Sequence, residues 1–356
     1  MGFIESRVDD EKLSGGVAFP KTLLPEAGSE GDLAKLVRAE RETLVAALGH
    51  HSALLFRGFQ VDSIDDFEQV VEAFGWKAYP VQQGITTRTK LSDRIYSSND
   101  ADPEHLISFH HEMSLVMNTR PSQDQLFLYI VLLATRFVLS LFASSPKNVM
   151  LVHVQRPSSP SKIFFYCSEP SPEGGETSVV ASDVVVEMME QRMPEFVAKA
   201  NELGLVFIVK TAHDTEADSG VVVNKSWKSS LRTNDEAEAV KRAPERIGCN
   251  LIRFLEDGRA ELTTGLMKPI GVFGEKRAWL VPLLGLTEIK EDISNLFGDG
   301  SAVPEEVLRI YTEILEENCV DIKWQKGDVL LLDNLVVQHA RRPGKPPRRI
   351  LASMCK

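Results

Sequence analysis

Phe109-His110-His111-Glu112-Met113 predicts more about this chain than any other stretch of its sequence. Residues two apart on a β-strand point to the same face, so we expect His110 and Glu112 to share a face and His111 to point away. A distant His339, in Asp333-Asn334-Leu335-Val336-Val337-Gln338-His339, would add a second imidazole on the same side of a metal ion. Two histidines and one carboxylate leave coordination positions open for a chelating co-substrate and O2, and this set suits non-haem Fe(II).

A His-x-Glu pair is weak evidence when it stands alone. Short motifs carry a high risk of false matches, and the ordinary alternative is a partly exposed pair on a loop. The metal-site interpretation therefore depends on the rest of the chain.

The composition is that of an ordinary soluble globular protein, with 43% hydrophobic and 26% charged residues. The net charge is -11, from 51 acidic residues against 40 lysines and arginines. An acidic surface argues against nucleic acid as the main partner, and a small molecule is the expected one. The oligomeric state is left open. A local exception to the acidic balance lies near the end of the chain, at Arg341, Arg342, Lys345, Arg348 and Arg349.

The four cysteines are far apart and form no Cys-x-x-Cys pair: Cys167, Cys249, Cys319 and Cys355. Free thiols in a reducing compartment are the simpler interpretation. The first residues lack the apolar run of a secretory signal peptide. We therefore expect an intracellular, cytoplasmic protein.

Apolar spacing and turn residues predict many short strands and few helices. Residues 1–30 are polar and rich in proline and glycine, which indicates an extended N-terminal arm, and residues 31–356 are expected to form one domain. Helices are predicted at residues 31–48, 63–75, 182–193 (with Ser182 as N-cap) and 305–318. Strands are predicted at residues 53–59, 95–99, 163–167, 178–181, 206–209, 329–334 and 348–352. This pattern favours a β-sandwich or jelly-roll.

Residues 126–143 form an apolar run with one charge, Arg136. The run is a marginal length for a membrane span, and a central arginine is costly there. A single span would also separate the two halves of the metal site, so we do not expect a membrane protein. Arg120-Pro121-Ser122 before the run nearly repeats as Arg156-Pro157-Ser158 after it. We predict that residues 123–161 are an atypical insertion or translated non-coding sequence; the alternative is a native helix packed on the fold.

Five motifs in one order carry a resemblance to a known family. They are Phe109-His110-His111-Glu112-Met113, Gly174-Gly175-Glu176-Thr177, residues 327–334, Gln338-His339 and Arg348-Arg349-Ile350-Leu351-Ala352. From about Leu54 to the C-terminus, except for the apolar segment, the chain resembles Fe(II)- and 2-oxoglutarate-dependent oxygenases of the taurine dioxygenase (TauD/TfdA) group. The closest resemblance is to the plant clavaminate synthase-like proteins. It implies a β-rich α+β protein with a double-stranded β-helix (jelly-roll) and flanking helices, using Fe(II), 2-oxoglutarate and O2.

The resemblance also implies residue roles. His110, Glu112 and His339 match the catalytic metal ligands of the family. Arg349 matches the arginine that pairs with the far carboxylate of 2-oxoglutarate, and Thr177 matches the threonine that hydrogen-bonds the same group. Arg348 is the neighbour with which Arg349 could be confused, since alternation on a strand turns only one of them inward.

Asn99 is a candidate substrate contact, and an ordinary turn residue is its equally weighted alternative. Two departures concern the substrate pocket. The second arginine that holds the sulfonate in taurine dioxygenases is replaced by Ser353, so a sulfonate substrate is not supported. Trp279 is followed by Leu280-Val281-Pro282 where the plant relatives have Phe-Asn, which puts the shape of the pocket in doubt.

The implied function is a dioxygenase that oxidises, by hydroxylation, a small organic substrate and releases succinate and CO2. Three alternatives stay open: a non-catalytic jelly-roll binding protein, a product disabled by the insertion at residues 123–161, and a membrane-anchored protein. The sequence does not identify the substrate.

Overall fold

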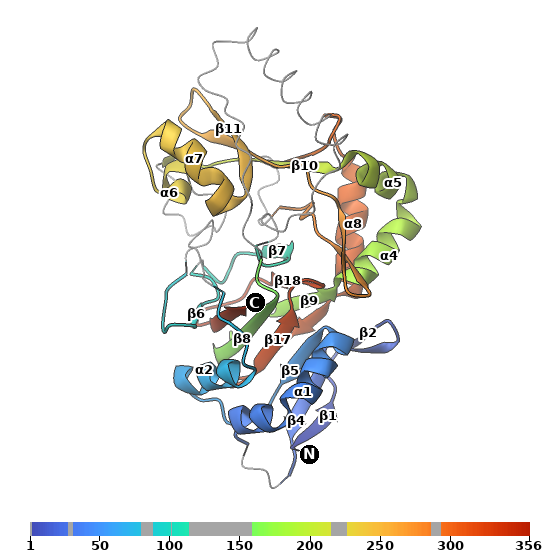
Figure 1. Cartoon of the computed structure of the whole chain (residues 1–356), viewed down its shortest axis with the longest axis vertical. Helices are drawn as coiled ribbons and strands as arrows, with labels where there is room; N and C mark the ends of the chain where they lie inside the picture. The colour runs from blue at the N-terminus through green and yellow to red at the C-terminus, as the bar shows by residue number, and fades with distance from the viewer. Residues whose placement is uncertain are drawn as a thin grey trace.

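The computed structural model describes residues 2–27, 31–79, 88–100, 102–113, 159–214, 226–285 and 293–356. All structural statements below concern these residues. They form a β-rich α+β protein, as predicted from the sequence (Figure 1).

The larger of the two central sheets has seven strands in the order β1-β4-β5-β17-β8-β19-β6. All neighbouring pairs are antiparallel except β4 and β5. Its central strand β17 has a continuous apolar run because both of its faces are buried. The strand bounds are β1 (Phe3–Ser6), β4 (Lys21–Pro25), β5 (Ala53–Phe56), β17 (Val329–Asp333), β8 (Lys162–Glu169), β19 (Arg349–Cys355) and β6 (Tyr96–Ser97).

A four-stranded sheet packs against the first one. Its order is β16 (Val320–Ile322), β9 (Thr177–Ala181), β18 (Val337–Arg341) and β7 (Ile107–His110), all antiparallel. The core between the sheets takes side chains from both, including Phe165 and Leu330 from one and Val179 and Val337 from the other. Strands distant in sequence are thus brought face to face.

Helices cover the outer face of the seven-stranded sheet. α1 (Leu33–His51) and α2 (Ile64–Ala73) pack on it through a shared apolar core (Figure 1). α2 begins where the sequence predicts, because Ser63 and Asp66 form a reciprocal capping box.

The outer face of the four-stranded sheet is covered by three further helices: α4 (Ser182–Arg192), α5 (Pro194–Leu203) and α8 (Glu305–Asn318) (Figure 1). The prediction that Ser182 caps α4 is wrong. The N-cap is Ala181, and the Ser182 hydroxyl instead accepts a hydrogen bond from the backbone N–H of Trp279 at 2.9 Å. A buried tertiary contact has displaced the local capping bond.

A separate sheet and two hairpins complete the described structure. The sheet order is β11 (Cys249–Phe254), β12 (Ala260–Thr264), β10 (Leu205–Lys210) and β15 (Ile293–Phe297), with α6 (Trp227–Leu231) and α7 (Glu236–Ile247) packed on it. The hairpins are β2 (Lys12–Ser14) with β3 (Val17–Phe19), and β13 (Ile270–Phe273) with β14 (Lys276–Trp279).

The segment predicted as an N-terminal arm contributes strands to the large sheet. β4 pairs with β5, and β1 pairs with β4, so these residues are tied to the rest of the fold by ladder hydrogen bonds. The division of the chain at residue 30 stays a prediction. Most of the proposed insertion at residues 123–161, including the apolar run 126–143, lies outside the described residues.

None of the described helices is long and apolar enough to cross a membrane. The four cysteines are free and buried, in agreement with the expected absence of disulfides.

Candidate metal centre

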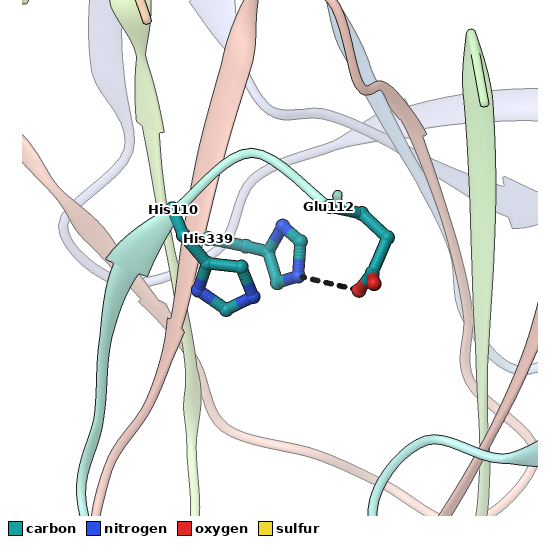
Figure 2. A group of neighbouring side chains, drawn as sticks. All are labelled: His110, Glu112 and His339. Carbon is teal, nitrogen blue, oxygen red and sulfur yellow. Dashed lines mark ion pairs between the residues drawn. The ribbon is translucent and has the colours of Figure 1, made fainter. Parts of the chain in front are cut away.

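His110, Glu112 and His339 lie together (Figure 2), and the ring of His339 packs beside Phe165 of the core between the two sheets. His110 ends β7 and stands directly opposite His339 on β18, and their ring centroids are 4.4 Å apart. One ligand atom from each of the three residues lies within 4.8 Å of the others. The sequence prediction that these side chains converge agrees with this geometry.

The route by which Glu112 reaches the group differs from the prediction. β7 ends at His110, and Glu112 lies in the following turn, where Met113 has a φ of 58°. Its carboxylate Oε2 nevertheless lies 3.9 Å from Nε2 of His339 (Figure 2). Asn334 fixes this turn, since its Oδ1 accepts from the Glu112 N–H at 2.8 Å and its Nδ2 donates to the Glu112 carbonyl at 3.1 Å.

His111 points away from the group, as predicted. Its Nδ1 lies 2.7 Å from the Asn334 carbonyl, and its Nε2 lies 3.0 Å from the Trp279 carbonyl. Burial lowers the pKa of His111 to about 4, although the hydrogen bonds to the two carbonyls oppose this shift. His111 therefore belongs to the internal hydrogen-bond network.

The two converging imidazoles are held in the form that binds metal. Burial lowers the pKa of His110, although the nearby Glu112 carboxylate opposes the shift, and burial lowers the pKa of His339 well below its ordinary value. Neutral imidazole is the metal-binding form. His110 Nδ1 lies 2.8 Å from the Ser108 carbonyl, which can only accept, so its Nε2 keeps a free lone pair.

The carboxylate is held in its anionic form. Burial alone raises the pKa of Glu112, but the charge of Arg88 and its hydrogen bond oppose this, and the pKa lies below its ordinary value. Arg88 Nη2 lies 2.7 Å from Glu112 Oε2. The Nδ1 of His339 is buried and has no hydrogen-bond partner among the described residues.

These observations fit a metal ion. Two neutral imidazoles and one anionic carboxylate, clustered away from bulk water, form the set that binds Fe(II) and leaves positions open.

The residue predicted to bind the far carboxylate of 2-oxoglutarate, Arg349, lines the same cavity as its neighbour Arg348, and the two differ in burial. Arg349 is exposed, whereas Arg348 is half-buried and points inward. Arg348 Nε donates to the Gly175 carbonyl at 2.7 Å, and its Nη2 lies 3.4 Å from the hydroxyl of Thr177. These contacts make Arg348, which precedes β19, a second candidate beside Arg349 for the carboxylate.

Thr177 lies where the motif predicts an inward hydroxyl. It is buried on β9, opposite Arg341 of β18 and two residues from the position opposite His339. Its Oγ1 also accepts a hydrogen bond from Trp324 Nε1 at 3.0 Å.

Asn99 lines a cavity of about 260 Å³ together with Arg341, Arg348 and Arg349. His110, Glu112 and His339 are not among the lining residues of this cavity, so a role of Asn99 in the site stays a prediction. Trp279, beside which the sequence departs from the plant relatives, is fully buried in the helix-covered core.

The basic run near the C-terminus is largely taken up by internal contacts. Arg342 pairs with Glu316 and Asp321, and Lys345 pairs with Glu173.

The model of the taurine catabolism dioxygenase TauD, TfdA family matches residues 153–355, which is more than half of the chain. A clavaminate synthase-like protein of Arabidopsis thaliana is 33% identical over 369 residues, covering 99% of this chain and 98% of the relative. The chain belongs to the TauD/TfdA family. It is therefore an Fe(II)- and 2-oxoglutarate-dependent oxygenase, and the resemblance to the plant proteins is confirmed.

Two further similar proteins are more distant. The dapdiamide synthesis protein DdaC of Enterobacter agglomerans is 23% identical over 329 residues, covering 86% of this chain and 83% of the relative. The crystal structure of PvcB from Pseudomonas aeruginosa is 14% identical, covers 100% of this chain and 92% of PvcB, and superposes with a TM-score of 0.50. At this identity the PvcB structure supports the fold alone.

Sequence reasoning missed Arg88 and the role of Asn334. Arg88 precedes Glu112 by 24 residues in a stretch without regular periodicity, so no local pattern marks it as a partner. Asn334 stands in one of the family motifs, but only the fold shows that its amide holds the Glu112 turn.

Proposed function

We propose that this TauD/TfdA member hydroxylates a small organic substrate and converts 2-oxoglutarate to succinate and CO2. One atom of O2 would enter succinate and the other the substrate, so the reaction balances without a further reductant. The observation that carries the proposal is the convergence of two neutral imidazoles and one anionic carboxylate from β7, the turn after it, and β18.

In this proposal His110, Glu112 and His339 hold Fe(II), which supplies the activation of O2 once 2-oxoglutarate is bound. Arg348 and Thr177 would bind the far carboxylate of 2-oxoglutarate. Their contact at 3.4 Å, between Arg348 just before β19 and Thr177 at the start of β9, supports this assignment because it brings a cation and a hydroxyl together. The packed apolar core between the sheets would limit access of water to the reacting atoms.

We also propose that the fold is a double-stranded β-helix (jelly-roll) forming one oxygenase domain over residues 31–356. Two sheets that face each other across one core, with helices on their outer faces, support this assignment. Ser353 stands where taurine dioxygenases have their sulfonate-binding arginine, so we do not propose a sulfonate substrate.

The test of the proposed function is His339→Ala in the full chain. Removing one of two imidazole ligands should abolish 2-oxoglutarate decarboxylation and remove most of the Fe(II) affinity. Iron binding and succinate release are measured for this variant and for His50→Ala, an exposed histidine that serves as the control. Normal iron binding and turnover in His339→Ala would contradict the assignment, and an iron-loaded wild type without succinate release would indicate a non-catalytic binding protein.

A further inference from the structure

Arg88 forms a buried ion pair with a candidate iron ligand. Its Nη2 donates to Glu112 Oε2 at 2.7 Å, and the two side chains are 8% and 10% exposed. On the other side of the guanidinium, Nη1 lies 3.7 Å from the thioether of Met354, a weak acceptor.

The pair is isolated from other opposite charges in the described part of the chain. Arg88 has no second carboxylate there, and the other basic groups near the Glu112 carboxylate are the two candidate metal ligands His110 and His339. Withdrawing an arginine and a glutamate from water costs several kcal/mol per ion before their attraction offsets it. An apolar residue at position 88 would avoid that cost, which points to a role in the site.

The contact leaves the two oxygens of Glu112 unequal. Oε2 accepts this charged hydrogen bond and is also the oxygen that lies 3.9 Å from His339 Nε2, whereas no described group donates to Oε1. A divalent ion that used both oxygens would lie on the oxygen occupied by the guanidinium and bring two positive charges together. Repulsion therefore favours an ion that is bound through one oxygen.

The number of Glu112 oxygens that bind the metal ion decides how many of its coordination positions stay open. Two histidines and a carboxylate that binds through one oxygen fill three of six octahedral positions, which leaves two for a chelating 2-oxo acid and one for O2. Carboxylates can also bind a metal through both oxygens, and the second oxygen would then take one of the open positions.

We propose that Arg88 is a positioning residue that keeps Glu112 a one-oxygen ligand and so preserves the positions for 2-oxoglutarate and O2. This inference rests on the proposed function. The inference predicts that loss of Arg88 changes the affinity of the loaded site for 2-oxoglutarate but leaves the affinity for the metal ion. A general loss of structure would lower both affinities together.

The experiment uses the full chain loaded with Co(II), whose visible absorption reports its coordination. Co(II) and then 2-oxoglutarate are titrated into wild type, Arg88→Met and Arg88→Lys. The matched control is Arg94→Met, because Arg94 is half-buried and its described contacts are with Trp76 and Cys355.

In Arg88→Met, Co(II) affinity should stay within about threefold of wild type, while 2-oxoglutarate affinity should fall by about tenfold or more. The absorption change on adding 2-oxoglutarate should shrink in the same variant. Arg88→Lys retains a charged donor and should restore most of the 2-oxoglutarate affinity, and Arg94→Met should behave like wild type.

Unchanged 2-oxoglutarate affinity in Arg88→Met overturns the inference. Parallel losses of Co(II) and 2-oxoglutarate affinity, with a lower unfolding temperature, overturn it as well, because they indicate a structural role only. If Arg88→Met does not fold, Arg88→Gln replaces it in the same comparison. Wild-type Co(II) binding that survives His339→Ala overturns the proposed function and this inference together, whereas failure confined to the Arg88 variants overturns this inference alone.

Discussion

Arg348 and Arg349 are adjacent but differ in burial: Arg348, just before β19, is half-buried, whereas Arg349, the first residue of β19, is exposed. The Arg348 side chain is held by the Gly175 carbonyl and lies near the Thr177 hydroxyl. Burial lowers the pKa of Arg348 to about 10, so its guanidinium stays charged at neutral pH. No acidic side chain pairs with it among the described residues. A cation withdrawn from water is stabilised by an anionic partner, and a 2-oxoglutarate carboxylate would supply one.

We predict that Arg348→Lys weakens 2-oxoglutarate binding by about tenfold or more, because lysine keeps the charge but loses the planar fork that binds a carboxylate. Arg349→Lys should leave the affinity near that of wild type, since the Arg349 side chain is exposed. Titration of 2-oxoglutarate into the iron-loaded variants measures both. A large effect of Arg349→Lys with none from Arg348→Lys would restore the role that the motif assigns.

Asn334 joins three segments at the turn between β17 and β18. Its side chain contacts both backbone groups of Glu112, and its Nδ2 donates to the Pro160 carbonyl at 2.8 Å. Its backbone N–H donates to the Ser161 carbonyl at 3.0 Å. The side chain is fully buried, so every one of these groups depends on a protein partner.

Asn334→Asp should destabilise the fold and weaken metal binding. The change removes the amide donor and places a carboxylate oxygen against the carbonyls of Glu112 and Pro160, at a cost of about 1–3 kcal/mol or more. Urea unfolding and Co(II) titration measure the two effects. The control is Asp333→Asn, which removes a partly exposed ion pair with Lys162 and should cost about 1 kcal/mol or less. Equal effects of the two substitutions would show that the Asn334 amide has no special role.

At the scale of the whole molecule, the contacts of residues 160–162, where the proposed insertion ends, decide how the insertion can be tested. Pro160 and Ser161 are bonded to the turn at Asn334, and the Ser161 N–H donates to the Cys355 carbonyl at 2.9 Å. Deleting residues 123–161 joins Arg120-Pro121-Ser122 to Lys162. The product has the same Pro-Ser pair in front of Lys162, so the backbone groups that make these contacts are retained.

We therefore predict that the chain without residues 123–161 folds, is more soluble than the full chain and is at least as active. The expected gain in solubility follows from the loss of a long apolar run. The matched control deletes residues 121–161, which also removes the Pro-Ser pair and should be less stable. Thermal unfolding, soluble yield and succinate release are compared for the three chains. Unfolding or loss of iron in the shorter deletion would show that the segment belongs to the core.

The features predictable from the sequence are those set by local patterns or by ligand type. The grouping of His110, Glu112 and His339 follows from residue types that share one metal chemistry, and the long helices and buried strands follow from apolar spacing and from the capping residue Ser63. These features can be predicted without knowledge of the fold, because each depends on a few neighbouring residues or on a set of ligand types that suits few metals.

The tertiary structure alone decided which polar groups meet in the core. Arg88 reaches Glu112 across 24 residues, Arg348 rather than Arg349 faces Thr177, and the Ser182 hydroxyl bonds to Trp279 rather than capping its own helix. Each outcome depends on which donors and acceptors are withdrawn from water together once the two sheets close. Burial makes an unpaired group costly, so the packed fold selects partners that no local pattern in the chain specifies.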